Sequence, residues 1–355
     1  MHTLIIGGGL GGLCLAQGLR KSGLSVAVYE RDMSVSFRGQ GYRIGIKDAG
    51  SDALRDCLPA DLYDLCAATS IATATRMVFM DHRLNVSKAW PITHRGSGFG
   101  VNRLTLREVL LTGLDDIVHF GANFERYTHE ADGIRAHFTD GSSAVGDLLV
   151  GADGTHSAVR HQLLPDSGLD ELGGFIYGRT PFADDVPDIL IDTFNQMTDS
   201  DGVSMSVATC RKHGTAPHLT DIADYFAWTV RTANLTEAEP AALHARARSL
   251  LGQWHPAVRR IVDEADIPAT FLVTVDSARP VPPWDVPTVT LLGDAIHTMS
   301  PGRGEGANIA LRDAALLRRT LAAGAPAARY EEEMLRYGFE AVAASRDRPL
   351  LRRSL

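Results

Sequence analysis

The chain opens on a short apolar segment followed at once by closely spaced glycines. Residues 2–6 lead directly into Gly7, Gly9 and Gly12, which form a G-x-G-x-x-G pattern. Glycines at this spacing allow a tight turn, let the backbone approach a pyrophosphate and let a helix pack on the preceding strand. A helix over 11–21 and a second strand over 25–29 complete a βαβ unit. The pattern predicts a Rossmann-like α/β domain that binds the ADP part of a dinucleotide.

An acidic residue ends the second strand of this unit. Glu30 lies about 20 residues beyond the glycines, where a carboxylate can accept hydrogen bonds from both ribose hydroxyls. It favours an adenosine without a 2'-phosphate, as in FAD or NAD, although a role that is limited to ending the strand stays open. We also expect cofactor contacts from Leu10 and Gly11 at the start of the helix, and from Arg31 beside the ribose site.

Composition narrows the class of protein. The 355 residues suffice for two domains or one elaborated domain, and a hydrophobic fraction of 45% can fill a substantial core. A net charge of -8 without a dense block of Lys and Arg argues against nucleic acid as a partner. No apolar run reaches the roughly 18 residues of a transmembrane helix. The glycine-broken N-terminus lacks the basic region of a signal peptide, so we expect a cytoplasmic protein.

The four cysteines show no C-x-x-C pair and no histidine cluster at metal-ligand spacing. We therefore expect buried free thiols and no metal site. Their positions are Cys14, Cys57, Cys66 and Cys210.

Two later segments place further glycine-rich turns after apolar strands. The strand expected at 147–150 delivers Gly151-Ala152-Asp153-Gly154 at its carboxyl end, which is where ligands sit in open α/β sheets. A strand over 288–292 is followed by Gly293-Asp294 and by a P-x-x-G-x-G-x-N run from Pro301 to Asn308, which opens a helix. Between these segments, residues 172–282 alternate strand-like stretches with loops, and an earlier stretch at 77–90 alternates like a hairpin of another sheet.

This ordered set of motifs resembles the single-component FAD-dependent aromatic hydroxylases of the p-hydroxybenzoate hydroxylase type, over nearly the whole chain. The resemblance implies an α/β fold: a Rossmann-like FAD-binding domain with an inserted antiparallel β-sheet substrate domain. We expect residues 1–70, 95–171 and 283–355 to form the FAD-binding domain, and residues 71–94 and 172–282 the substrate-binding domain.

The resemblance also implies roles for individual residues. Asp294 would hydrogen-bond a ribitol hydroxyl, and the helix that opens after Gly304 would point its N-terminus at the pyrimidine side of the flavin. Asp153 would act by organising Arg160, or would only form an Asp-Gly turn. The remaining cofactor candidates by resemblance are Arg43, Arg103, Pro301, Gly306, Ala307 and Asn308. Arg43 matches only loosely, and a surface arginine or a loop proline are the alternatives for Arg103 and Pro301.

The implied function is a monooxygenase that uses NADH or NADPH and O2 to hydroxylate or epoxidise a small aromatic or electron-rich substrate through a flavin C4a-hydroperoxide. Two alternatives stay open: a same-fold FAD enzyme without net oxygenation (a dehydrogenase or cyclase), and a non-catalytic ligand-binding protein. The sequence identifies no catalytic base, and we expect His297 to be structural. Candidates for the substrate pocket, with core packing as the alternative, are His82, Tyr177, Tyr225 and Trp228. A monomer and a homodimer are equally compatible.

Overall fold

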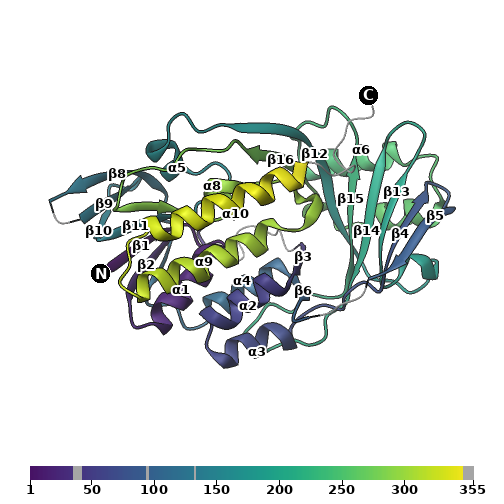
Figure 1. The fold of residues 1–355 in the computed structure, drawn as a ribbon. Helices are drawn as coiled ribbons and strands as arrows, with labels where there is room; N and C mark the ends of the chain where they lie inside the picture. Colours follow the sequence, from purple (N-terminus) through teal and green to yellow (C-terminus); the bar gives the residue numbers. More distant parts are fainter. Residues whose placement is uncertain (35–41, 93–95, 132, 347–355) are drawn as a thin grey trace.

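The computed structural model describes residues 1–34, 42–92, 96–131 and 133–346, and it shows two bodies side by side (Figure 1). The first body is built on a parallel sheet with the strand order β17-β11-β1-β2-β7. Its strands are β1 (His2–Ile6), β2 (Ser25–Glu30), β7 (Val118–Phe120), β11 (Leu148–Gly151) and β17 (Val289–Leu291). The predicted Rossmann-like sheet is therefore confirmed, and β1 at its centre is buried from Thr3 to Ile6.

Helix α1 (Leu10–Lys21) packs on this sheet beneath α9 (Gly306–Ala322), and the long α10 (Ala328–Arg346) lies along α9 (Figure 1). Every residue from Leu10 to Leu19 is buried. Glycines let α1 approach its neighbours closely: a Cβ at Gly11 would lie 2.8 Å from the Leu292 side chain, and one at Gly18 would lie 2.9 Å from Arg318. This packing fixes the start of α1 against the start of α9.

Shorter elements complete the first body. The remaining helices are α2 (Asp48–Cys57), α3 (Ala60–Ala68), α4 (Arg103–Leu111), α5 (Ala158–Leu163) and α8 (Asp294–His297). A three-stranded sheet consists of β8 (Phe124–Glu130), β9 (Gly133–Phe138) and β10 (Ser143–Gly146), and β3 (Arg43–Ile46) pairs with β6 (Phe99–Asn102) in an antiparallel ribbon. All four cysteines are buried free thiols, as expected.

The second body is a seven-stranded sheet with the order β16-β12-β15-β14-β13-β4-β5. Its strands are β4 (Arg76–Asp81), β5 (Val86–Pro91), β12 (Leu169–Pro181), β13 (Thr193–Thr198), β14 (Ser204–Cys210), β15 (Tyr225–Arg231) and β16 (Phe271–Ala278). The predicted hairpin near 77–90 is present as β4 and β5. One detail of the predicted antiparallel sheet is wrong: β13 pairs with β4 in parallel, because these strands come from distant segments and no hairpin sets their direction.

Helices α6 (Pro240–Leu250) and α7 (Pro256–Asp263) cover one face of this sheet. The other face carries Tyr177, Tyr225 and Cys210 and packs with Ile71 and Tyr42 from the segments that join it to the first body. The side chains of one strand alternate between these two faces. Within the described ranges, none of the helices combines the length and the apolar content that a membrane crossing would require.

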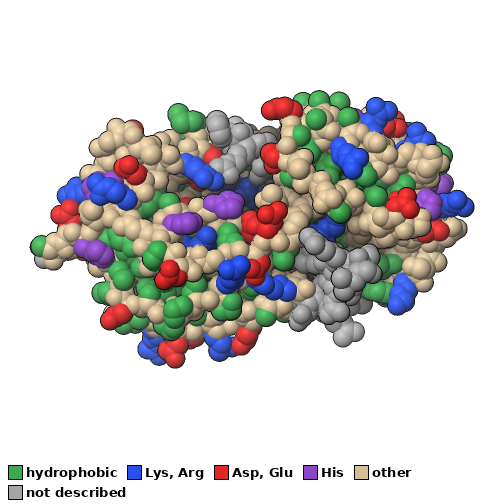
Figure 2. Space-filling model, turned by 90° about the horizontal axis from the view of Figure 1, so that it is seen from above, with side chains coloured by type: hydrophobic (Ala, Val, Ile, Leu, Met, Phe, Trp, Pro, Cys, Tyr) green, Lys and Arg blue, Asp and Glu red, His purple; other side chains and the backbone are tan. Residues whose placement is uncertain are grey.

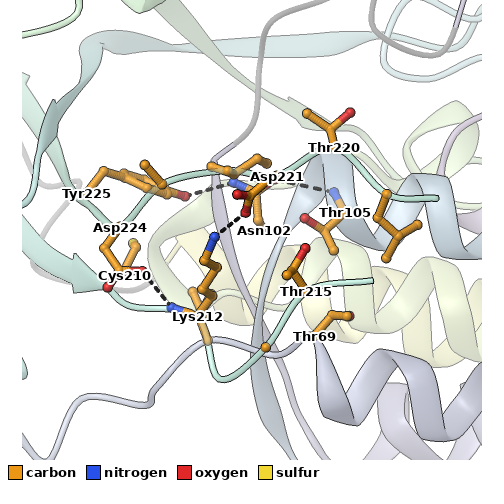
Figure 3. A pocket seen from close by; sticks show the side chains of 15 residues that line it. Thr69, Asn102, Thr105, Cys210, Lys212, Thr215, Thr220, Asp221, Asp224 and Tyr225 are labelled. Carbon is orange, nitrogen blue, oxygen red and sulfur yellow. Dashed lines mark hydrogen bonds and ion pairs between the residues drawn. The ribbon is translucent and has the colours of Figure 1, made fainter. Parts of the chain in front are cut away.

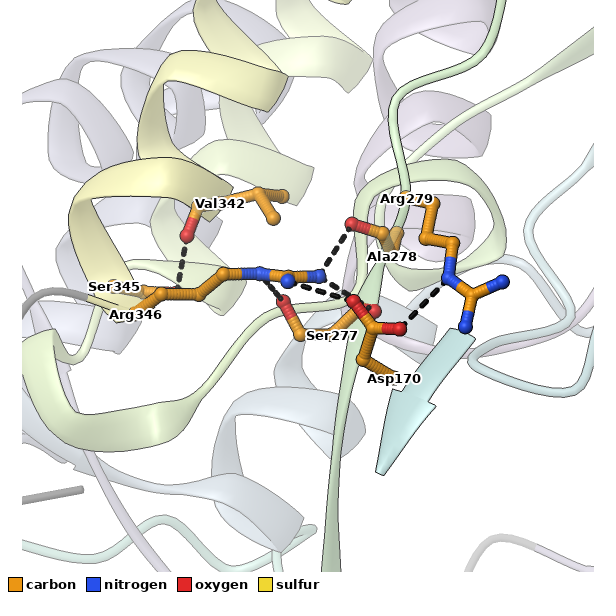
Figure 4. A network of polar contacts seen from close by, with 7 residues as sticks. All are labelled: Asp170, Ser277, Ala278, Arg279, Val342, Ser345 and Arg346. Carbon is orange, nitrogen blue, oxygen red and sulfur yellow. Dashed lines mark hydrogen bonds and ion pairs between the residues drawn. The ribbon is translucent and has the colours of Figure 1, made fainter. Parts of the chain in front are cut away.

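A polar network ties the end of α10 to the seam between the bodies (Figure 4). The Arg346 guanidinium donates to Ser277 Oγ at 2.7 Å and to Asp170 Oδ2 at 2.7 Å, and Arg279 Nε donates to the other Asp170 oxygen at 2.7 Å. Asp170 lies at the start of β12 and Ser277 near the end of β16. The last helix of the first body is therefore fastened to two strands of the second.

Candidate cofactor and substrate site

The three glycines of the first motif have different structural reasons. Gly7 has a φ of +111°, and a Cβ there would lie 2.3 Å from the Ala152 carbonyl oxygen. A Cβ at Gly12 would lie 2.2 Å from the Gly7 carbonyl oxygen. The middle glycine, Gly9, begins α1 without a side-chain cap, and none of the described residues has an atom within 4 Å of its Cβ position. The first and third glycines thus serve packing, and the second leaves open space beside unpaired helix N–H groups, as an anion site needs.

The next two candidates, Leu10 and Gly11, direct their side-chain positions into the protein. The Leu10 side chain is buried in the core, and Gly11 packs against Leu292 and α9. Neither residue presents a side chain to a ligand. Arg31, by contrast, is exposed just after β2.

Glu30 is buried and already held by the protein. Its Oε2 accepts the Gly8 N–H at 2.7 Å, and its Oε1 accepts the Asp32 N–H at 2.8 Å. The buried Arg107 lies 3.3 Å from Glu30 and 3.5 Å from Asp32, and its Nε donates to the Gly8 carbonyl at 3.0 Å. Sequence reasoning missed Arg107. The available signal was a charged residue on the buried face of α4, one turn after Arg103.

Asp153 organises the loop after β11. Its Oδ1 accepts from Ser157 Oγ at 2.5 Å and its Oδ2 from the Ala158 N–H at 2.8 Å, so it caps the start of α5. Burial raises the pKa of Asp153, and these hydrogen bonds oppose the shift. Arg160 then donates to the Thr155 carbonyl at 2.8 Å and to the Ala295 carbonyl at 2.9 Å. The second motif is therefore linked to the third.

The third motif begins at Gly293, whose φ of +61° and ψ of -141° suit only glycine. Asp294 follows at the start of α8 with an exposed side chain, although it lies deep among other groups. Desolvation raises the pKa of Asp294, and the charges of His297 and Arg103 lower it. A carboxyl group that is accessible in a deep position is suited to bind a ligand hydroxyl.

His297 is fully buried and paired with the equally buried Asp313, at 2.6 Å from Nε2 to Oδ2. Burial lowers the pKa of His297, but Asp313 and Asp294 raise it, and the net shift is upward. The histidine reaches no solvent. The structure is consistent with the structural role that we expected for it.

The turn before α9 is shaped by Gly304, whose φ is +61°. Pro301 begins a one-turn 3-10 helix over Pro301–Arg303, and in the part of the chain that the structure describes no atom lies within 4 Å of a Cβ at Gly304. Gly306 starts α9 and would meet nothing closer than 3.8 Å, the Asp294 carboxylate. Ala307 follows at the half-buried first turn. This loop therefore leaves open space next to a helix N-terminus.

The side-chain amide of Asn308 forms hydrogen bonds within the protein. Its Nδ2 donates to the carbonyls of Gly45 and Gly304, both at 2.9 Å, and its Oδ1 accepts the Lys47 N–H at 2.7 Å. Asn308 therefore clamps the α9 turn to β3. It shapes the site instead of presenting its side chain.

Beside this clamp lies a cavity of about 360 Å³ along the β3/β6 ribbon, lined by Arg43, Gly45 and Gly100 among others. Gly45 has nothing within 4 Å of its Cβ position, so a flat group can rest on the strand. The Nε of Arg43 is buried and, among the described residues, has no hydrogen-bond partner. Arg103 lies across the ribbon, 5.4 Å from the Tyr42 ring. Figure 2 shows a recess between the two bodies with Lys or Arg side chains in it.

The four substrate-pocket candidates do not come together. Tyr177 and Tyr225 lie on the sheet face toward the first body, whereas Trp228 is fully buried on the opposite face and donates to Thr180 at 3.0 Å. His82 follows β4, with its ring 6.2 Å from Trp254 near α7. Strand parity explains the position of Trp228, because it is three residues from Tyr225 and so points to the other face, where core packing, the alternative given for it, holds.

Tyr225 has little room beside it. Its hydroxyl accepts from Asn102 Nδ2 at 3.0 Å, and it lines a cavity of about 20 Å³ with Lys212, Asp221 and Thr105 (Figure 3). That volume holds about one water molecule. On the same face, the Tyr177 hydroxyl is buried without a hydrogen-bond partner among the described residues.

Comparison with known proteins agrees with this geometry. Residues 111–347 match the family model described as FAD binding domain, and residues 5–58 match the NAD(P)-binding Rossmann-like domain. The chain belongs to the FAD-binding domain family. The site fits FAD, because open glycines lie at both helix N-termini and Asp294 is accessible between them.

Relatives of known name are FAD-dependent monooxygenases and hydroxylases. The FAD-dependent monooxygenase thnD of Trichoderma harzianum is 32% identical over 90% of this chain and 83% of its own length. An FAD-dependent urate hydroxylase of Klebsiella oxytoca is 29% identical over 89% of this chain and 80% of its own. A crystal structure from Photorhabdus luminescens, assigned as an FAD-containing monooxygenase, superposes with a TM-score of 0.83 at 32% identity, covering 97% and 96% of the two chains.

Some relatives are much longer. A dual O-methyltransferase/FAD-dependent monooxygenase of Phaeosphaeria nodorum is 31% identical over 92% of this chain, and the match spans only 40% of that protein. The shared part excludes most of its length.

Proposed function

We propose that this protein is an FAD-dependent monooxygenase that uses NADH or NADPH and O2 to hydroxylate or epoxidise a small aromatic or other electron-rich molecule. The observation that carries the proposal is that three distant motifs follow three neighbouring parallel strands, β1, β11 and β17, at the same edge of one sheet. Helix α1 of the first motif packs against α9 of the third, and Arg160 joins the second motif to the third.

The residues divide into those that would hold FAD and those that shape its site. The N–H groups at Gly9 and Leu10 would bind the pyrophosphate, Glu30 the adenosine ribose and Asp294 the ribitol, while the α9 N-terminus would face the pyrimidine edge. Asp153 and Asn308 would act through the loops that they fix. Bound FAD supplies the redox chemistry, which includes accepting electrons from the nicotinamide and activating O2.

The substrate would bind on the face of the seven-stranded sheet that carries Tyr177 and points toward the first body. Residues 71–94 and 172–282 are the proposed substrate-binding part. Tyr177 packs there against Phe271 at 5.0 Å and Tyr42 at 6.0 Å between ring centroids, which suits an aromatic ring. Burial raises the pKa of Tyr177 well above its usual range, so it would serve as a hydrogen-bond donor and not as a base. The packed bodies would also keep water from the reacting atoms.

The test begins with the purified protein reconstituted with FAD and scanned by absorption. A panel of phenols, purines and fused aromatic rings is then screened for substrate-stimulated oxidation of NADH and NADPH, with O2 uptake and product mass measured under labelled O2. A product that gains one labelled oxygen atom supports the proposal. Oxidation of substrate without incorporated oxygen would show a dehydrogenase or cyclase of the same fold, and a protein that cannot retain FAD would show a ligand-binding protein.

A further inference from the structure

A buried polar cluster lies next to the Asp294 segment. Asp313, on α9, accepts three hydrogen bonds and is fully buried. Its Oδ2 accepts the Gly293 N–H at 2.8 Å and the His297 ring nitrogen at 2.6 Å. Its Oδ1 accepts the Tyr337 hydroxyl, from α10, at 2.6 Å.

Asp313 forms hydrogen bonds at both ends of α8. Gly293 precedes Asp294 and His297 ends this four-residue helix, so one carboxylate oxygen spans the whole segment. The helix is too short to hold its own shape, because its N–H groups at the first turn have no partners within it. Gly293 can adopt many backbone conformations, so the hydrogen bond from its N–H to Asp313 helps to select this one.

The side chains of the cluster are closely packed. A Cβ at Gly338 on α10 would lie 2.6 Å from the His297 ring, so α10 passes as closely as a backbone can. The Arg312 guanidinium covers the Tyr337 ring at 3.7 Å on the outer side. Three elements therefore hold the Asp313 carboxylate in place, and the carboxylate in turn holds α8.

We propose that Asp313 is a positioning residue for FAD, which sets the direction of the Asp294 side chain by fixing the backbone on both sides of it. The proposal rests on the proposed ribitol role of Asp294. The two oxygens of the carboxylate have different roles in this proposal. Oδ2 holds the backbone next to Asp294, whereas Oδ1 accepts from Tyr337 and supports only the packing of α10.

Two variants separate these halves. Asp313→Ala removes the acceptor of Gly293 and His297, and we expect the Kd for FAD, measured by flavin fluorescence on reconstitution of the apoprotein, to rise at least tenfold. Tyr337→Phe removes one hydrogen bond to the same carboxylate without touching Gly293. We expect it to lower the melting temperature of the apoprotein but to leave the Kd for FAD within twofold.

An isosteric variant then separates charge from geometry. Asp313→Asn keeps an oxygen for Gly293 and His297, while its amide can donate to a Tyr337 hydroxyl that turns to accept. We expect Asp313→Asn to restore the Kd for FAD to within threefold of wild type. A purely structural role would not order the variants in this way, because the Kd would then follow apoprotein stability.

If Asp313→Ala does not fold, the double variant Asp313→Leu/His297→Leu replaces the buried pair by apolar side chains of similar volume, which buried pairs often tolerate. It should keep the fold and still bind FAD at least tenfold more weakly. The proposal is overturned if the folded variant that lacks the Asp313 carboxylate binds FAD within twofold of wild type, or if Tyr337→Phe weakens FAD as much as that variant does. Asp294→Ala, run in parallel, reports on the ribitol role alone: unchanged FAD affinity there would remove the proposed function of Asp294 whatever Asp313 does.

Discussion

Glu331 gives this protein a built-in dependence of stability on pH. It lies on α10 and is buried, with 7% of its surface exposed. Burial raises the pKa of Glu331 to about 7. Interactions with Thr290 and Trp284 lower this pKa, but by less than burial raises it. A carboxyl group that binds its proton more tightly in the folded state destabilises the fold as pH rises from its unfolded pKa, near 4.5, to its folded pKa.

The size of the effect follows from the shift. Raising the pKa of Glu331 from 4.5 to about 7 makes the folded protein about 3 kcal/mol less stable above pH 7 than at acidic pH, through this group alone. Glu331→Gln carries no charge at any pH and should escape the penalty. We therefore expect the gain in stability of Glu331→Gln over wild type to grow by about 2 to 3 kcal/mol between pH 5 and pH 8.

Thermal unfolding with saturating FAD, at several pH values from 5 to 8, measures this gain. For a chain of 355 residues the unfolding entropy is roughly 0.7 kcal/mol/K, so the melting temperatures should diverge by about 3 to 4 °C over that range. The matched control is Glu332→Gln, on the exposed side of the same helix turn, which should show no such divergence. A constant difference between Glu331→Gln and wild type from pH 5 to pH 8 would refute the reasoning.

Three further predictions concern the first glycine turn, the aromatic residues of the seven-stranded sheet and the Arg346 network. Gly12→Ala should destabilise the apoprotein by about 1 to 3 kcal/mol, because its Cβ would strike a carbonyl, whereas Gly9→Ala should leave the apoprotein melting temperature nearly unchanged and raise the Kd for FAD several-fold. Tyr177→Phe should change KM for the substrate with little effect on stability, and Trp228→Phe should lower stability by about 1 kcal/mol with KM unchanged; steady-state kinetics and thermal unfolding check both. Arg346→Ala should cost about 1 to 2 kcal/mol in thermal unfolding but leave the Kd for FAD within twofold, since its network joins the bodies away from the glycine turns.

The parts of the site that could be predicted from sequence are those in which the signal is local. Gly7 has a positive φ, and a Cβ at Gly12 would strike the Gly7 carbonyl, so one reason for each glycine lies within the turn itself. The Asp153 cap works over five residues, and Gly293 takes a backbone conformation that only glycine suits. Such features can be recognised without knowing the rest of the fold.

The parts that were missed depend on partners far away in the chain. Arg107 meets Glu30 and Asp32 across more than 70 residues, and Asp313 receives bonds from helices on either side of it. The face on which Trp228 lies could not be read without knowing that α6 and α7 cover one side of the sheet. Alternation along β15 fixes the parity of its side chains, but only packing decides which parity faces the cofactor.

The Asp294 segment is held from two sides, and this links motifs that are far apart in the sequence. Arg160, positioned by the loop that Asp153 caps, donates to the Ala295 carbonyl, while Asp313 accepts the Gly293 N–H. One hydrogen bond therefore fixes the residue after Asp294 and another the residue before it. Because the two supports come from different elements, the loss of either leaves Asp294 tethered on one side only. Loosening the D-G loop should thus disturb the ribitol end of the site, although Asp153 itself need not touch FAD there.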